Sequence, residues 1–165
     1  MHVRKMIGAV ALAVGLSAPA FAQSGVAVKH LQTDRSAIAS AVWAGDTLYV
    51  SGQVPSPVTP ADRAKGTPAD YGDMKTQAAS ALGKIDATLK EQGLTMADVV
   101  MMHVYMVGDP KNEGKLDFAG MNAAYSQYFG TKDQPNKPSR SAVQVAALAA
   151  PGALVEIEVT AVKSK

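Results

Sequence analysis

"MKTQAASALGKIDATLKEQGLTMADVVMMHVYMVGDP", residues 74–110, joins a helical pattern to a strand pattern. In its first half apolar residues recur every three or four positions, and Gly93 suits a left-handed stop. The spacing predicts an amphipathic helix that starts after Asp73 and packs on a sheet with one apolar stripe: Met74, Ala78, Leu82, Ile85 and Leu89. Residues 98–110 are rich in β-branched and large apolar residues and end in Gly-Asp-Pro, which predicts a central strand.

The segment before this helix predicts strands followed by a long loop. Short apolar runs flank Gly45-Asp46, so two strands around a tight turn are expected there, with a weaker strand at residues 26–32. Residues 54–72 contain four prolines and several small polar residues, which argues against regular structure. We interpret this loop as a surface excursion and not as a domain linker, because too little chain precedes it to form a separate core.

The segment after residue 110 predicts one more helix and two more strands. "LDFAGMNAAYSQYFG", residues 116–130, carries one apolar stripe: Phe118, Met121, Tyr125 and Phe129. Residues 140–148 and 153–162 alternate between apolar and other residues and are separated by a turn sequence. If these two strands formed a hairpin, Arg140 would lie beyond Glu158, and the sequence does not force Arg140 to pair with Glu156.

The order of elements predicts an α+β domain. Three strands precede the first helix, one strand separates the helices, and two strands end the chain. This order favours one mixed sheet with both helices on a single face.

The first 22 residues have the layout of a secretory signal peptide. Arg4 and Lys5 precede an apolar run, and small residues end in Ala20-Phe21-Ala22. We expect cleavage after Ala22, a domain at residues 23–165, a periplasmic or secreted location and no membrane association after cleavage. The alternative is an uncleaved anchor helix, for which the apolar run is shorter than the roughly 20 residues that a bilayer requires.

Charge and composition exclude several classes of function. The chain has 16 Lys+Arg and 14 Asp+Glu, and loss of Arg4 and Lys5 would leave 14 of each. A neutral domain lacks the basic field that drives binding to nucleic acid, so no nucleic-acid partner is expected. The chain has no cysteine, which excludes disulfides, thiol catalysis and thiolate metal sites.

Motifs for metals, phosphates and hydrolase nucleophiles are also missing. The sequence contains no HExxH, GxGxxG, GxxxxGK[ST] or GxSxG pattern. His103 lies within an apolar strand and is interpreted as a hydrogen-bonded structural histidine. Arg140 remains, either as a charge at the start of a strand or as a ligand clamp. Glu156 and Glu158 remain as well. They share one face of a strand, and on a simple interpretation that face is the solvent-exposed face of an edge or outer strand.

Five stretches together resemble the Rid family of enamine/imine deaminases, also known as the YjgF or L-PSP family. They are "GDTLYVSGQVP", "DVVMMHVYMVGD", "FAGMNAAYSQYF", "PSRSAVQVAAL" and "LVEIEVTAV", in this order, and the resemblance covers about residues 40–163. It implies a chorismate-mutase-like α+β fold, a homotrimer with sites in clefts between subunits, and chemistry that needs no cofactor and no metal.

The resemblance also implies roles for individual residues. Arg140 matches the family arginine that holds the substrate carboxylate, and a planar guanidinium suits that task because it donates two parallel hydrogen bonds. Glu156 matches the glutamate that positions or activates the water which adds to the imine carbon. Glu158 is then structural. The remaining cleft positions, which would contact the substrate, are Ser51, Gly52, Asn122 and the backbone at Ala142.

Three functions follow, from different classes. The first is hydrolysis of small 2-imino acids, tautomers of enamines, to 2-oxo acids and ammonia. The second is a non-catalytic protein that binds a small carboxylate such as a 2-oxo acid, because "SAIASAVWAG", residues 36–45, lacks the tyrosine or proline found in many deaminases of the family. The third, a ribonuclease or translation inhibitor, rests only on family labels, and both the neutral charge and the leader count against it.

Overall fold

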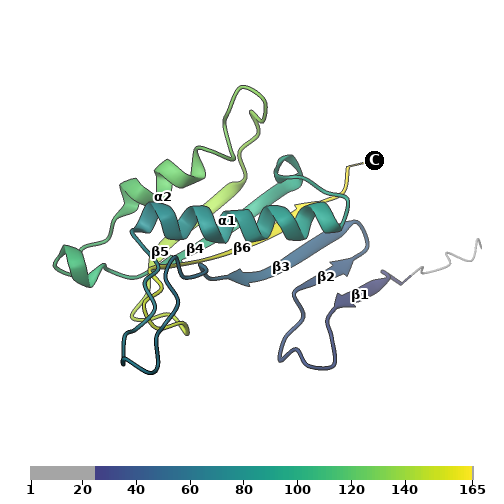
Figure 1. The fold of residues 1–165 in the computed structure, drawn as a ribbon. Coiled ribbons are helices and arrows are strands. Elements are labelled where there is room, and N and C mark those ends of the chain that lie inside the picture. Colours follow the sequence, from purple (N-terminus) through teal and green to yellow (C-terminus); the bar gives the residue numbers. More distant parts are fainter. Residues whose placement is uncertain (1–24, 165) are drawn as a thin grey trace, which may run out of the picture.

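Six strands and two helices occupy residues 25–164, the part of the chain that this computed structural model describes (Figure 1). The predicted leader lies outside the described residues. The strands are β1 Val28–Leu31, β2 Ala41–Ala44, β3 Thr47–Gln53, β4 Val99–Met106, β5 Ser139–Gln144 and β6 Val155–Val162, and the helices are α1 Met74–Glu91 and α2 Phe118–Tyr125. Two short 3-10 helices, η1 Met96–Asp98 and η2 Pro110–Asn112, flank β4.

Helix α1 begins and ends where the sequence predicts. The Asp73 side chain accepts a hydrogen bond from the Thr76 backbone N–H at 2.8 Å and so satisfies one of the free donors of the first turn. Gly93, with φ of +73°, follows the helix in the left-handed conformation that favours glycine. The predicted apolar stripe is buried at every position: Met74, Ala78, Leu82, Ile85 and Leu89.

Both helices cover one face of a single sheet, as predicted (Figure 1). The strand order is β1-β2-β3-β6-β4-β5, and β5 runs parallel to β4 while the other neighbours are antiparallel. Under the helices lie the buried alternate residues of the central strands: Leu48 and Val50 of β3, Met102, Val104 and Met106 of β4, and Val155, Ile157, Val159 and Ala161 of β6. The predicted α+β domain is confirmed.

The two final strands do not form a hairpin. Strand β6 lies between β3 and β4, and β5 lies at the edge of the sheet beyond β4. The edge or outer position considered for the strand with Glu156 and Glu158 is therefore wrong. The composition of the two strands explains this order: the inward residues of β6 are all apolar and buried, which suits a strand with two neighbours, whereas most residues of β5 are exposed. Arg140 is level with Met102 of β4, so the hairpin position considered for it is wrong.

Helix α2 is shorter than the predicted 116–130. It ends at Tyr125, and turns continue to Gly130. Met121 and Phe129 are buried as predicted, but Phe118 is 42% exposed, so the stripe does not belong to the core along its whole length.

The loop at residues 54–72 leaves the body of the domain and returns to it. Isolated bridges between Thr59 and Asp70 and between Asp62 and Thr67 give it an internal pairing that its prolines did not indicate. Lys84 of α1 donates a hydrogen bond to the Val54 carbonyl at 2.8 Å and anchors the start of the loop. Within residues 25–164 no helix is long and apolar enough to cross a bilayer.

Candidate functional site

Arg140 projects from the edge strand toward α2. It lies opposite the buried Met102 in the β4–β5 register, so its side chain is on the helix-covered face. Its Nη2 donates to Asn122 Oδ1 at 3.0 Å. Its guanidinium carbon lies 4.4 Å from the centroid of the Tyr125 ring and 5.8 Å from that of Phe118. Neutral groups therefore fix the plane of the guanidinium.

The charge of Arg140 remains available to a ligand. Among the described residues no carboxylate forms an ion pair with it. A guanidinium has five N–H donors, and the protein acceptors on Arg140 are Asn122 Oδ1 and the weak acceptor Met121 Sδ, 3.9 Å from Nη1. Burial raises the pKa of Tyr125, although Arg140 acts in the opposite direction, so the stacked ring is a neutral phenol at neutral pH. The arrangement can accept a small carboxylate.

Glu156 lies next to the bulge at the end of β3. A Cβ atom built on Gly52 would come within 2.1 Å of Glu156 Oε1, so only a glycine leaves room for the carboxylate in this position. The neighbouring Ser51 hydroxyl donates to the Ala39 carbonyl at 2.7 Å and is therefore engaged within the protein. Glu156 itself has no ion-pair partner among the described residues. Its carboxylate can serve as an acceptor for water or for a ligand.

Glu158, two residues further along β6, has partners from β4. Its Oε1 lies 3.0 Å from His103 Nδ1 and accepts from the Tyr105 hydroxyl at 3.1 Å. The pKa of Tyr105 is raised, mainly by desolvation and next by its hydrogen bond to Glu158. The contacts agree with the interpretation of Glu158 as structural and of His103 as a hydrogen-bonded histidine.

The candidate residues form two groups on opposite faces of the sheet. The first group is Arg140, Asn122, which contacts it, and Ala142, which lies on the same face of β5 as Arg140. The second group is Glu156 with Ser51 and Gly52 nearby. Glu156 pairs with Tyr105, whose side chain points away from the helices, whereas Arg140 pairs with the core residue Met102. A single chain therefore does not bring Arg140 and Glu156 to one point.

Two members of the Arg140 group were not predicted from the sequence. Tyr125 and Phe118 were assigned to a core stripe, but their rings flank the guanidinium. The signal that could have found them is their spacing from Asn122: Phe118 lies four residues before it and Tyr125 three residues after it, which places both rings beside that amide on one helix. Within residues 25–164 no group of three or more His, Asp or Glu side chains could hold a metal ion.

Comparison with known proteins decides the family. A family model described as Endoribonuclease L-PSP matches residues 20–163. The chain belongs to the L-PSP family, also called YjgF or Rid. L-PSP relatives include a RutC family protein of Haemophilus influenzae, which is 37% identical over 74% of this chain and 84% of its own length. A protein of Escherichia coli named "Putative reactive intermediate deaminase TdcF" is 36% identical over 73% of this chain and 81% of its own length.

Solved structures of the L-PSP family share the fold. A crystal structure of E. coli TdcF with bound serine is 30% identical, covers 82% of this chain and 99% of the TdcF chain, and has a TM-score of 0.62. NMB1025 of Neisseria meningitidis, described as a member of the YjgF family, is 28% identical, covers 85% of this chain and 98% of its own, and has a TM-score of 0.61.

Proposed function

We propose that this protein hydrolyses small 2-imino acids to 2-oxo acids and ammonia, without a cofactor. The observation that carries the proposal is the pair of uncommitted charges: Arg140, held by neutral groups, and Glu156, fitted against Gly52. The deaminase name given to TdcF and the serine bound to it support a small ligand with a carboxylate. We favour this reaction over RNA cleavage because the chain without its predicted leader has equal numbers of basic and acidic residues.

The proposed site is shared between copies of the chain. Arg140 and Glu156 point to opposite faces within one protomer, so a cleft that uses both requires Arg140 of one copy and Glu156 of another. A closed ring of identical subunits repeats such a contact at every interface. We therefore propose a homotrimer with three equivalent sites, as the resemblance implies.

In this reaction each half of the cleft has a separate task. Arg140 binds the carboxylate of the imino acid through two parallel hydrogen bonds and so orients the imine carbon. The substrate enters as the protonated imine. Glu156 accepts a proton from water as the water oxygen adds to the imine carbon, which gives a neutral carbinolamine. Glu156 returns this proton to the nitrogen and takes the hydroxyl proton as the C–N bond breaks, so the products are a 2-oxo acid and ammonia, and Glu156 releases its proton to solvent.

The test is an imino-acid hydrolysis assay with the leaderless protein. An amino-acid oxidase generates the imino acid in situ, and release of ammonia or 2-oxo acid is followed with wild type, Arg140→Ala and the matched control Arg63→Ala. Loss of the charged clamp should lower kcat/KM by about 100-fold. The exposed Arg63 should have no effect. Equal rates with and without wild-type protein would refute the deaminase.

A second candidate, a binding protein for small carboxylates, is favoured by one observation. Residues 32–40, which precede β2, carry no aromatic side chain, and Ile38 is 69% exposed. Calorimetric binding of a 2-oxo acid that is lost in Arg140→Ala, with no turnover in either protein, would select this function.

The first 22 residues have the layout of a secretory signal peptide. We propose that residues 1–22 direct the chain out of the cytoplasm and are removed after Ala22. N-terminal sequencing of the protein from a fractionated bacterial host should begin at Gln23 in the periplasmic or secreted fraction. Recovery of an intact N-terminus from the cytoplasmic fraction would refute export.

A further inference from the structure

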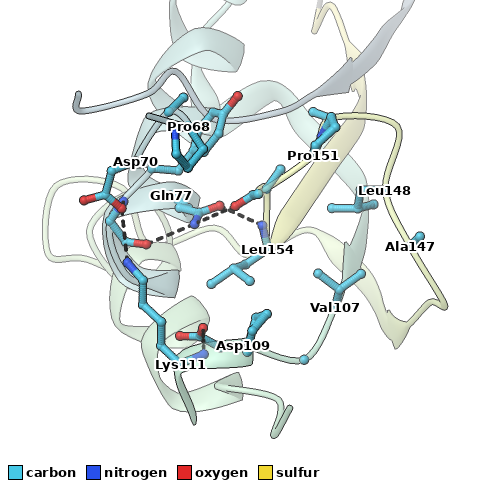
Figure 2. Close-up of a pocket in the computed structure, with 18 of the residues that line it drawn as sticks. Pro68, Asp70, Gln77, Val107, Asp109, Lys111, Ala147, Leu148, Pro151 and Leu154 are labelled. Carbon is cyan, nitrogen blue, oxygen red and sulfur yellow. Dashed lines mark hydrogen bonds and ion pairs between the residues drawn. The ribbon is translucent and has the colours of Figure 1, made fainter. Parts of the chain in front are cut away.

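A cavity of about 650 Å³ lies among three loops at one end of the sheet (Figure 2). Its walls are residues 67–72 of the long loop, residues 107–111 after β4, and residues 146–148 and 150–154 between β5 and β6. This volume is in the range of sites for small molecules. The long loop, which the proposed deaminase chemistry does not use, thus helps to form a concave surface.

The cavity is already formed because one buried amide joins its walls. Gln77 of α1 is 2% exposed; its Nε2 donates to the Gly72 carbonyl at 3.0 Å, and its Oε1 accepts from the Leu154 backbone N–H at 2.7 Å. Tyr71 lies against the backbone of Gly152, where a Cβ atom would be 3.2 Å from the ring. Two of the three loops are therefore held in place without a ligand.

Charge and apolar surface are separated across the cavity. Figure 2 shows Asp70 and Lys111 on one side and Val107 and Leu148 on the other. Lys111 Nζ lies 3.2 Å from Asp70 Oδ1, and the two side chains are 77% and 53% exposed. An exposed ion pair of this kind contributes little stability, so a ligand can replace it at low cost. Hydrogen bonding from the Gly72 N–H, followed by Lys111, lowers the pKa of Asp70, which keeps it ionised at neutral pH.

The residues that line the cavity are not those of the proposed deaminase site, although Leu154 lies only two residues before Glu156. Neither Arg140 nor Glu156 lines it, and neither do Ser51, Gly52, Asn122 or Ala142. Arg140 is near the start of β5, and the cavity begins with Ala146, after the end of that strand. Six residues of extended chain span roughly 20 Å.

We propose that this cavity binds a small α-amino acid with an apolar side chain. The ammonium group pairs with Asp70, the carboxylate pairs with Lys111, and the side chain packs on Val107, Leu148 and Leu154. A zwitterion fits because it supplies one partner to each member of the Asp70–Lys111 pair. A simple carboxylate would leave Asp70 without a charged partner, and a simple amine would leave Lys111 without one.

The test is calorimetry on the leaderless protein with L-leucine, 4-methylpentanoate and 3-methylbutylamine. These probes share an apolar body and carry both charges, the carboxylate alone or the ammonium alone. We expect L-leucine to bind at least about tenfold more tightly than either single-charge probe, and Asp70→Asn and Lys111→Met each to weaken L-leucine binding by about tenfold. Both residues are exposed, so these variants should fold.

Two further variants locate the binding. Leu148→Trp, checked for an unchanged melting temperature, should abolish L-leucine binding by occupying the apolar side of the cavity where the ligand side chain packs, whereas Arg140→Ala should bind L-leucine as wild type does. Absence of L-leucine binding, or equal binding of all three probes, would overturn the proposal. Binding lost in Arg140→Ala but kept in Asp70→Asn would also overturn it, and would assign the amino acid to the deaminase site. A negative result in the imino-acid assay alone would refute the deaminase and not the amino-acid site in this cavity.

Discussion

Arg140 and Glu156 of one chain point to opposite faces of the same six-stranded sheet, because Arg140 is paired with Met102 and Glu156 with Tyr105. If the site needs both, neither Arg140→Ala nor Glu156→Gln should be active alone. Co-refolding the two inactive variants in equal amounts should restore activity, because about a quarter of the interfaces in randomly mixed rings combine a native Arg140 with a native Glu156. Ammonia release by the mixture, relative to wild type, measures this fraction.

The co-refolding experiment needs a control without chain exchange, and two outcomes would contradict a shared site. Variants refolded separately and assayed together without chain exchange should remain inactive. No recovery after verified chain exchange would place Arg140 and Glu156 in different functions, and substantial activity of either variant alone would remove that residue from the mechanism.

Asn122 is expected to control how strongly Arg140 binds a carboxylate. Its Oδ1 accepts a hydrogen bond from Arg140 Nη2 at 3.0 Å. Asn122→Asp would therefore place a carboxylate beside the guanidinium, where it would compete with the ligand carboxylate. We expect KM for an imino acid to rise severalfold in Asn122→Ala and about 100-fold in Asn122→Asp. Equal effects of the two substitutions would show that packing and not charge is responsible.

Substitutions of Tyr125 test the stacking of its ring on the guanidinium of Arg140. Its ring centroid is 4.4 Å from the guanidinium carbon, and a contact of this kind contributes about 1 kcal/mol. Tyr125→Phe keeps the ring and should retain the KM of wild type, whereas Tyr125→Leu should raise KM about fivefold. A large effect of Tyr125→Phe would instead assign a role to the hydroxyl.

Local patterns predicted the elements of this fold, but not the order of its strands. The stripe from Met74 to Leu89 and the stop at Gly93 are properties of consecutive residues, and the structure confirms them. The position of β6 between β3 and β4 depends on pairing between segments that are distant in sequence. Periodicity shows which residues of a strand share a face, but it does not show which strand lies beside it.

The same limit applies to the candidate site. Alternation in β6 was sufficient to predict that Glu156 and Glu158 share a face away from the core. That Arg140 lies on the other face depends on the β4–β5 register, and its stacking on Tyr125 depends on where α2 crosses the sheet. The family resemblance supplied the candidate residues, and the structure shows that they form two separate groups.

Gly52 is expected to be required for activity more than for folding. Its added Cβ atom would lie 2.1 Å from Glu156 Oε1, so Gly52→Ala must displace that carboxylate. A shift of about 1 Å in a reacting group can reduce the rate about 100-fold. Gly83→Ala is the matched control, because its Cβ atom meets only the Tyr128 hydroxyl at 3.6 Å and alanine favours helix α1. Comparable activity of both variants in the imino-acid assay would show that the position of Glu156 is not critical.

Asp73 should link the stability of the domain to pH through the start of α1. Hydrogen bonds from Thr76 lower the pKa of Asp73 below the ordinary value of an aspartate. A folded pKa below the unfolded one means that the ionised cap stabilises the fold above the unfolded pKa, and that this contribution is lost as pH falls through the folded pKa. Asp73→Ala should lower the free energy of unfolding by about 1 kcal/mol at pH 7, and the difference in stability from wild type should narrow below about pH 4.

Asp73→Asn keeps an acceptor, so it should remove the part of the pH dependence that comes from Asp73 with little loss of stability at pH 7. The exposed Asp133→Ala serves as the control. Urea unfolding of the four proteins between pH 3 and 7 measures these differences, and a constant gap between wild type and Asp73→Ala across that range would contradict a role for the ionised carboxylate.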